Sequence, residues 1–352
     1  MKKIVKQSLF KNDFTYRLFM PLMQFYVINV RTMVTDIHSL FNYYVLRLDN
    51  GPKKIELPKM LFVNPTNFCN AKCGFCAYRK VGDQFKNLDL GSYRKVIDQY
   101  AALGGKKISL TPTIGEVLLD PTIYEKIAYA KQKGMYVSIV SNGVLINNND
   151  NYRKLLDADV DELIFSIGDI VPKYEAIVFG IPEAVSKNKM EGLLKMLAEM
   201  DRRKPDYKIR LAFRPMRRYD QIMGDLKKSE FWQYYEKGLF DTEFLVGYDN
   251  WGGRIAQQEL AGIQKLKRPH QVKKYPCHNL YTLSILGSGD VRLCGCRVKN
   301  TIYDELVIGN INQTPLEEIM KSKKWTEIIS EFGKGNLPEV CKGCSFYAPR
   351  YR

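Results

Sequence analysis

The eight cysteines of this 352-residue chain fall into three short groups. Three lie at positions 69–76, three at 277–296 and two at 341–344, and none lies between Cys76 and Cys277. Disulfide scaffolds are short chains with far more cysteine for their length. Tight groups of thiols instead indicate metal ligation in a reducing compartment, which predicts a cytoplasmic protein.

The first group, Cys69-Asn-Ala-Lys-Cys73-Gly-Phe-Cys76, places three thiols within eight residues. Structural zinc sites take four ligands, commonly as two separated pairs. Three thiolates suit a [4Fe–4S] cluster, because they bind three irons and leave the fourth open to a chelating molecule. A zinc site or a redox-active trithiolate is the alternative interpretation.

Six apolar runs in the middle of the chain alternate with amphipathic stretches. The expected strands cover 59–64, 106–112, 135–143, 162–168, 207–215 and 241–250. Helices are expected at 92–103, 121–134, 151–158 and 182–200. Strands separated by helices form right-handed crossovers and a mainly parallel sheet. The pattern predicts an α/β fold, a partial (β/α)6 TIM-like barrel.

Polar residues recur where these strands end, and in parallel α/β sheets function collects at those carboxyl ends. The residues are Cys69, Cys73 and Cys76 after the first strand, Thr113 to Glu116 after the second, Ser141 to Gly143 after the third, Ser166 and Asp169 at the fourth, and Arg214 at the fifth. Together they predict the rim of a site.

A C-x3-C-x2-C motif directly after the first strand of such a fold resembles the radical S-adenosylmethionine (radical SAM) superfamily, over residues 59–250. The resemblance implies that Cys69, Cys73 and Cys76 hold a [4Fe–4S] cluster whose open iron binds the amino and carboxylate groups of S-adenosylmethionine. One electron, supplied by a flavodoxin- or ferredoxin-type donor, then cleaves the sulfonium. The products are methionine and a 5′-deoxyadenosyl radical that abstracts hydrogen from a substrate carbon.

The same resemblance implies contacts with S-adenosylmethionine. Ile114-Gly115-Glu116 matches the family's Gly-Gly-Glu motif without its first glycine, and Ser141-Asn142-Gly143 matches its Thr/Ser-Asn-Gly turn. The implied cofactor-binding residues are Phe75 near the adenine, Gly115, Glu116, Ser141, Asn142, and Ser166 and Arg214 for the ribose and carboxylate. An ordinary turn or surface role is the alternative for each.

A Lys/Gln-rich linker (256–275) leads to a second unit, with a hairpin turn at 287–290 and a helix at 315–333. We therefore expect an N-terminal helical extension (1–58), a barrel (59–255), and a linker with a small hairpin-plus-helix domain (256–352).

The spacing Cys277-x11-Gly289-x4-Cys294 resembles the hairpin that opens the auxiliary-cluster domains called SPASM and twitch. The resemblance implies that Cys277, Cys294, Cys341 and Cys344 ligate a second [4Fe–4S] cluster, although a zinc ribbon fits the same count. Because the chain ends at Arg352, we expect the shorter twitch form or a truncated SPASM domain.

The eighth cysteine, Cys296, is a spare apolar residue, an alternative to Cys294 as ligand, or a catalytic thiol facing the substrate. An S–H bond is weaker than most carbinol C–H bonds, so such a thiol returns hydrogen to a carbon radical. Some epimerases of the family use a cysteine in this way.

The expected reaction is therefore epimerisation, slightly favoured by Cys296, or oxidation to a ketone. The expected substrate is a sugar, a cyclitol, or a nucleotide- or lipid-linked sugar. Modification of a ribosomal peptide is the alternative, disfavoured because residues 1–58 do not resemble a leader-binding winged helix. No RNA-binding motif is present in the sequence, so modification of RNA is the less favoured second alternative and a nucleic-acid partner is not expected.

The composition, with 45% hydrophobic and 26% charged residues, excludes a disordered chain and a multi-span membrane protein. The net charge of +16 suits phosphate-bearing substrates or an anionic membrane. An apolar stripe of helical period runs through 14–45, at Phe19, Leu22, Met23, Tyr26, Val27, Val30, Val34, Ile37, Phe41 and Tyr44. Packing of this stripe against the barrel is the favoured expectation, and peripheral contact with the inner membrane face or a partner is the alternative.

Overall fold

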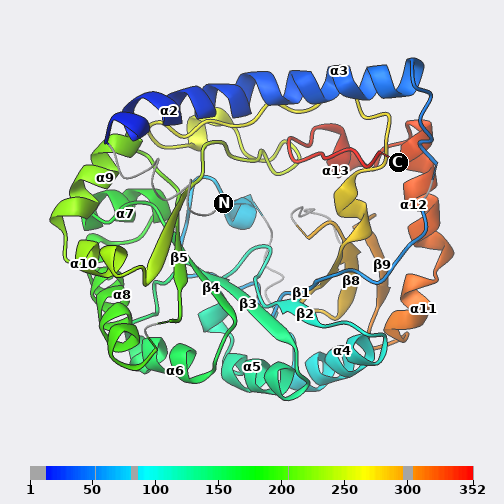
Figure 1. The fold of residues 1–352 in the computed structure, drawn as a ribbon. Helices are drawn as coiled ribbons and strands as arrows, with labels where there is room; N and C mark the ends of the chain where they lie inside the picture. The colour runs from blue at the N-terminus through cyan, green and yellow to red at the C-terminus, as the bar shows by residue number, and fades with distance from the viewer. Residues whose placement is uncertain (1–12, 52, 81–85, 205, 296–303, 352) are drawn as a thin grey trace.

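The computed structural model describes residues 13–51, 53–80, 86–204, 206–295 and 304–351, with side chains from residue 17 onward. Within these residues a nine-stranded sheet runs in the order β6-β5-β4-β3-β2-β1-β7-β8-β9 (Figure 1). The strands are β1 (Leu61–Val63), β2 (Lys107–Ser109), β3 (Tyr136–Ser141), β4 (Glu162–Ile167), β5 (Ile209–Phe213), β6 (Phe240–Phe244), β7 (Leu283–Ile285), β8 (Asp290–Leu293) and β9 (Val307–Asn310).

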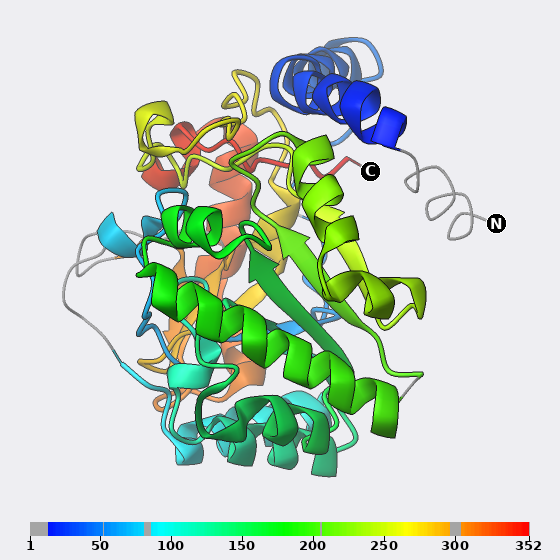
Figure 2. The same cartoon turned by 90° about the vertical axis from the view of Figure 1, so that its left-hand side faces the viewer.

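Strands β1 to β6 pair in parallel and curve into a partial barrel with helices on its outer face (Figure 2). The covering helices are α4 (Leu90–Ala102), α5 (Ile123–Gln132), α6 (Asn151–Asp157), α7 (Pro172–Phe179), α8 (Glu183–Arg203), α9 (Tyr219–Lys228) and α10 (Phe231–Glu236). Alternation along the strands produces this layering: Val137 and Ile139 are buried in the core, while Ser138 on the other face donates to Glu162 Oε2 at 2.8 Å. The predicted fold class is confirmed, although α7, α9 and α10 were not predicted.

The C-terminal region continues the barrel sheet, because β7 pairs in parallel with β1. Strands β7 and β8 form the predicted hairpin, and β9 pairs with β8 as a third strand. Gly289 in the turn has a φ of +82°, a backbone conformation that glycine adopts without strain.

The single helix predicted over 315–333 is wrong in detail. The segment forms α11 (Leu316–Met320) and α12 (Lys323–Lys334), followed by α13 (Glu339–Lys342). Ser322 is extended (φ −64°, ψ 139°) and starts the second helix, which breaks the run. Trp325 of α12 is fully buried and its indole N–H donates to the Leu280 carbonyl at 2.8 Å. The break therefore lets Trp325 of α12 reach the turn at His278–Tyr281, just before β7.

At the N-terminus α2 (Asp13–Phe25), a π-helical turn (Tyr26–Val30) and α3 (Arg31–Tyr44) form one long rod across the top of Figure 1. The favoured expectation that its apolar stripe packs on the barrel is wrong. Seven stripe residues are 44–62% exposed, namely Phe19, Leu22, Tyr26, Val34, Ile37, Phe41 and Tyr44. Of the rod's described apolar side chains only Met20 and Val27 are buried, and along α3 the inward side is polar, with Thr32, Asp36, Ser39 and Asn42 facing carbonyls and polar groups of the chain beneath. Among the described residues, no helix has the length and apolar character needed to cross a membrane.

Candidate functional site

The first cysteine group lies in the loop that follows β1. Cys73 is buried against Val178 and Phe179 of α7, and the Lys72 N–H donates to the Phe179 carbonyl at 2.8 Å. Burial raises the pKa of the Cys69 thiol to about 12 and raises the pKa values of Cys73 and Cys76 as well. Burial therefore disfavours the charged thiolate form of all three side chains. Bound iron would offset that charge, so this donor set fits a metal cluster.

Nearby donors and a cation favour the thiolate forms. The Tyr78 N–H donates to Cys76 Sγ at 3.4 Å, and Asn142 Nδ2 lies 3.9 Å from Cys69 Sγ. The pKa of Cys76, raised mainly by burial, is lowered in part by the Tyr78 hydrogen bond and by the charge of Arg214. Asn142 and Arg214, both predicted site residues, thus lie at the first cysteine group.

The ends of β2 and β3 are joined by Glu116. This fully buried carboxylate accepts hydrogen bonds from Ser141 Oγ and the Asn142 N–H, both at 2.6 Å. Burial raises the pKa of Glu116, and these donors act against the increase. Its neighbour Gly115 has a φ of +123°, and an added Cβ would come within 2.9 Å of the Thr66 carbonyl. Glu116 and Ser141 therefore act on the rim as positioning residues.

At the end of β4 the structure reveals a buried ion pair that the sequence did not predict. Lys189 Nζ pairs with Glu175 and donates to the Ser166 carbonyl at 2.8 Å. Glu175 also accepts the N–H groups of Gly168 at 2.6 Å and Asp169 at 2.9 Å. Two charges fourteen residues apart gave no local signal, because only the packing of α7 on α8 brings them together. The pair fixes the backbone next to Ser166.

The second cysteine group comprises Cys277, Cys294, Cys341 and Cys344, each 7–9% exposed. Burial, together with the charges of neighbouring thiolates, raises the pKa of Cys277 to about 12 and raises that of Cys341 further. The N–H groups of Ala348 and Phe346 lie 3.5 Å from Cys277 Sγ and 3.2 Å from Cys344 Sγ. Four thiols converging with N–H donors fit a fully ligated cluster.

Among the described side chains, no three His, Cys, Asp or Glu residues are arranged to hold a single metal ion. Cys296, the predicted catalytic thiol, lies outside the described residues.

A loop after β6 joins the two cysteine groups. The Trp251 indole N–H donates to the Phe75 carbonyl, beside Cys76, at 2.9 Å. Asn250 Nδ2 donates to the Gly343 carbonyl at 2.8 Å, and the Asn250 N–H donates to Ser345 Oγ at 2.9 Å, on either side of Cys344. These hydrogen bonds tie the loop to both cysteine groups. The loop is therefore a bridge between the first and the second cysteine group.

Positive charge is buried beside the second group. Arg292 is 2% exposed; its Nε pairs with Asp304 at 2.6 Å and Nη1 donates to the Cys294 carbonyl at 2.6 Å. Its Nη2 has no partner among the described residues, nor has Oγ of Ser284, the residue opposite it on β7. Burial, and then the charge of Arg292, lowers the pKa of Arg254. Two guanidinium groups thus lie near one carboxylate, an arrangement that attracts an anion.

Family models match both halves of this arrangement. The radical SAM superfamily model matches residues 63–228, over the first cysteine group and the barrel. An iron–sulfur cluster-binding domain model, SPASM, matches residues 277–345, over the second group. This chain is a radical SAM enzyme. Its C-terminal region is a SPASM-type domain, and the two domains imply S-adenosylmethionine and iron–sulfur clusters as cofactors.

Curated relatives of this radical SAM enzyme match over part of their length. A tungsten-containing aldehyde ferredoxin oxidoreductase cofactor-modifying protein from Pyrococcus furiosus is 26% identical over 149 residues, 42% of this chain and 41% of that protein. A PqqA peptide cyclase from Granulibacter bethesdensis is 26% identical over 137 residues, 38% of this chain and 35% of that protein. The matches therefore span well under half of these relatives.

Solved structures share the fold. BtrN in complex with AdoMet and 2-DOIA is 17% identical, with a TM-score of 0.52, over 83% of this chain and 94% of BtrN. SuiB from Streptococcus suis, bound to its precursor peptide SuiA, is 15% identical, with a TM-score of 0.55, over 89% of this chain and 75% of SuiB. At these identities the likeness supports the fold alone.

Proposed function

We propose that this radical SAM enzyme abstracts hydrogen from a carbinol carbon of a sugar, a cyclitol, or a nucleotide- or lipid-linked sugar, and yields an epimer or a ketone. The observation that carries the proposal is the charge of buried Arg292 and half-buried Arg254 beside the second cysteine group. A guanidinium matches the oxygens of a phosphate with two parallel hydrogen bonds. Arg292 Nη2 and Ser284 Oγ are buried donors that such a substrate satisfies.

The residues that would hold the cofactors follow from the two thiol sets. Cys69, Cys73 and Cys76 would hold one cluster, and Cys277, Cys294, Cys341 and Cys344 the other. When bound, these groups and S-adenosylmethionine supply a one-electron cleavage that gives methionine and a 5′-deoxyadenosyl radical able to take the carbinol hydrogen.

The chain's own residues position and enclose the reactants. Glu116 orients Asn142 toward the first cysteine group, and Arg214 contributes a positive charge there. Phe75 packs against Tyr248, with ring centroids 5.4 Å apart. This contact limits the access of water to the loop that carries the first cysteine group. Cys296 would return hydrogen to the opposite face of the substrate radical if the product is an epimer.

Modification of a ribosomal peptide is the second candidate. The match to a PqqA peptide cyclase and the fold shared with the peptide-bound SuiB favour it. A peptide without a phosphate or carboxylate would leave no specific task for Arg292 and Arg254, so for such a substrate the two candidates predict different consequences of removing Arg292.

Anaerobic reconstitution tests the proposal. The enzyme, reduced by flavodoxin, is assayed for 5′-deoxyadenosine with nucleotide sugars and with peptides, and we expect about eight irons per chain. With a phosphorylated sugar, Arg292→Gln should raise the KM more than it lowers kcat. In deuterated water an epimerase incorporates solvent deuterium at the inverted carbon, and Cys296→Ala removes that label. Turnover with peptides alone would contradict the sugar assignment.

A further inference from the structure

An exposed apolar face runs along α2 and α3, on the side of the rod that points away from the protein. Of the fifteen large hydrophobic side chains that are exposed among the described residues, thirteen lie between Leu18 and Leu46. Soluble proteins seldom leave apolar side chains gathered in this way, and such patches mark contact surfaces. The remaining two, Phe68 and Ile177, lie elsewhere.

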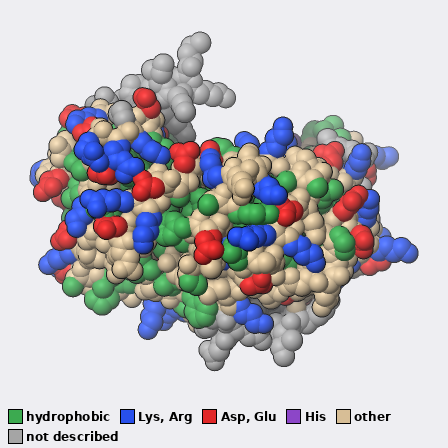
Figure 3. Space-filling model, turned by 90° about the horizontal axis from the view of Figure 1, so that it is seen from below, with side chains coloured by type: hydrophobic (Ala, Val, Ile, Leu, Met, Phe, Trp, Pro, Cys, Tyr) green, Lys and Arg blue, Asp and Glu red, His purple; other side chains and the backbone are tan. Residues whose placement is uncertain are grey.

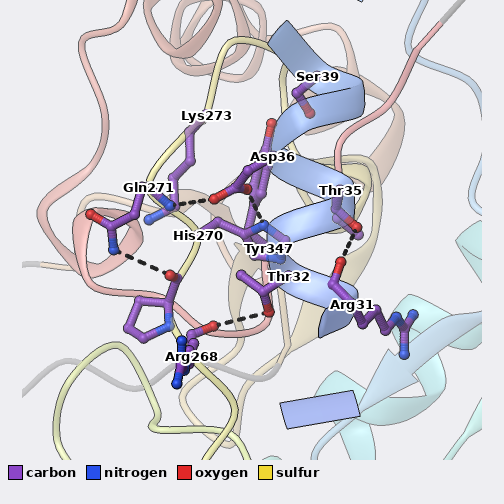
Figure 4. Close-up of polar contacts among 12 residues, drawn as sticks. Arg31, Thr32, Thr35, Asp36, Ser39, Arg268, His270, Gln271, Lys273 and Tyr347 are labelled. Carbon is purple, nitrogen blue, oxygen red and sulfur yellow. Dashed lines mark hydrogen bonds and ion pairs between the residues drawn. The ribbon is translucent and has the colours of Figure 1, made fainter. Parts of the chain in front are cut away.

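The opposite side of the same rod is polar along α3 and is fixed to the protein (Figure 4), although Met20 and Val27 are buried on it nearer the N-terminus. Asp36 accepts from the Gln271 N–H at 2.9 Å and pairs with His270 Nδ1 at 2.6 Å. Ser39 Oγ lies 2.8 Å from the Tyr351 hydroxyl, and Gln24 donates to the Ile263 carbonyl at 2.8 Å. A surface helix normally turns its apolar side inward. Here a rotation of the helix about its axis that buried the apolar side would break these contacts. The contacts therefore fix the outward orientation of the apolar side.

The exposed charges along the rod itself have one sign. Between residues 17 and 47 the exposed ionised side chains are Arg17, Arg31 and Arg47, while the carboxylate of Asp36 is buried. The supporting segment 260–275 contains five lysines and arginines and no carboxylate, and its Lys265 and Arg268 are exposed. The opposite side of the molecule instead mixes basic and acidic side chains (Figure 3).

We propose that α2 and α3 dock this enzyme onto an anionic lipid bilayer, with the rod lying in the plane of the interface. A helix of this kind buries its apolar side at the level of the headgroups and acyl chains while its cations contact anionic lipid. The rod of 13–44 is roughly 45 Å long at ~1.5 Å per residue, a straight ridge that suits a flat surface. A second copy of the chain suits it less, because two molecules of net charge +16 repel each other.

The proposal goes beyond the proposed chemistry and is tested separately from it. The reconstituted full-length chain is sedimented with vesicles of phosphatidylcholine alone or of phosphatidylcholine mixed with phosphatidylglycerol. We expect binding to the mixed vesicles that weakens with added salt. The double variant Ile37→Glu/Phe41→Glu should lose at least about tenfold in binding, since it places charge at the acyl boundary. Arg17→Gln and Arg31→Gln should each weaken binding by roughly fivefold, on the mixed vesicles only.

Ile177→Glu is the matched control, because Ile177 is 52% exposed on α7, away from the rod. It should bind like the wild type. Formation of 5′-deoxyadenosine and iron content should be retained in all variants, which shows that the chain is folded whatever its substrate is. Absence of vesicle binding, or equal binding by Ile37→Glu/Phe41→Glu, would overturn the proposal. So would a dimer in light scattering that this double variant dissociates, since a second copy would then cover the face.

Discussion

The two cysteine groups differ in how the chain assembles them. The first comes from one loop of eight residues, and two of its thiols, Cys69 and Cys76, are partly exposed. The second draws four buried thiols from the hairpin and from the C-terminal segment, 67 residues apart in the sequence at its extremes. A three-thiol loop at a strand end leaves room for a ligand, whereas four enclosed thiols leave none. The comparison separates a reactive site from a closed one.

Removing a thiol from the first group should have the largest effect on chemistry. Cys73→Ala leaves two ligands, so the cluster that binds S-adenosylmethionine is lost and 5′-deoxyadenosine formation should fall to background. Iron content should drop from about eight to about four per chain. Retained cleavage of S-adenosylmethionine in this variant would contradict the assignment of the first group.

The same change in the second group should separate the two sites. Cys341→Ala should also lower iron to about four per chain, while slow cleavage of S-adenosylmethionine continues without product formation. Because the bound cluster would tie the hairpin to the C-terminal segment through Cys341, thermal stability should also fall when it is lost. The two cysteine variants should therefore differ. Cys73→Ala stops cleavage of S-adenosylmethionine, whereas Cys341→Ala allows cleavage without product formation.

The ion pair behind the first group should have the largest effect on folding. Glu175→Gln leaves the ammonium of Lys189 buried without its partner, at a cost of about 3–5 kcal/mol in the free energy of unfolding. Denaturant titration measures the loss. Replacing both residues, as in Glu175→Gln/Lys189→Met, should recover much of it, because no unpaired charge then remains. If the single variant were as stable as the wild type, the pair would not support this rim.

These cases also show what the sequence does and does not determine. The spacing of Cys69, Cys73 and Cys76 is local, so the sequence alone predicted the group and the fold that carries it. The Glu175–Lys189 pair and the α3 contacts depend on tertiary packing, and Asp36 meets His270 across 234 positions. Periodicity identified the N-terminal helix but not the direction of its apolar face, since that direction depends on what lies beneath it. The predicted inward packing was wrong for this reason.

The bridge between the two groups should give the smallest effect and the sharpest comparison. Trp251→Phe keeps an aromatic ring but removes the donor to the Phe75 carbonyl, a loss of about 1 kcal/mol in the free energy of unfolding. If the bridge sets the spacing of the two clusters, 5′-deoxyadenosine should form at the wild-type rate while less product forms per cleavage. Asn250→Asp removes the donor to the Gly343 carbonyl at the other end and should have the same signature. If stability fell while the amount of product per cleaved S-adenosylmethionine stayed the same, the loop would be a structural link only.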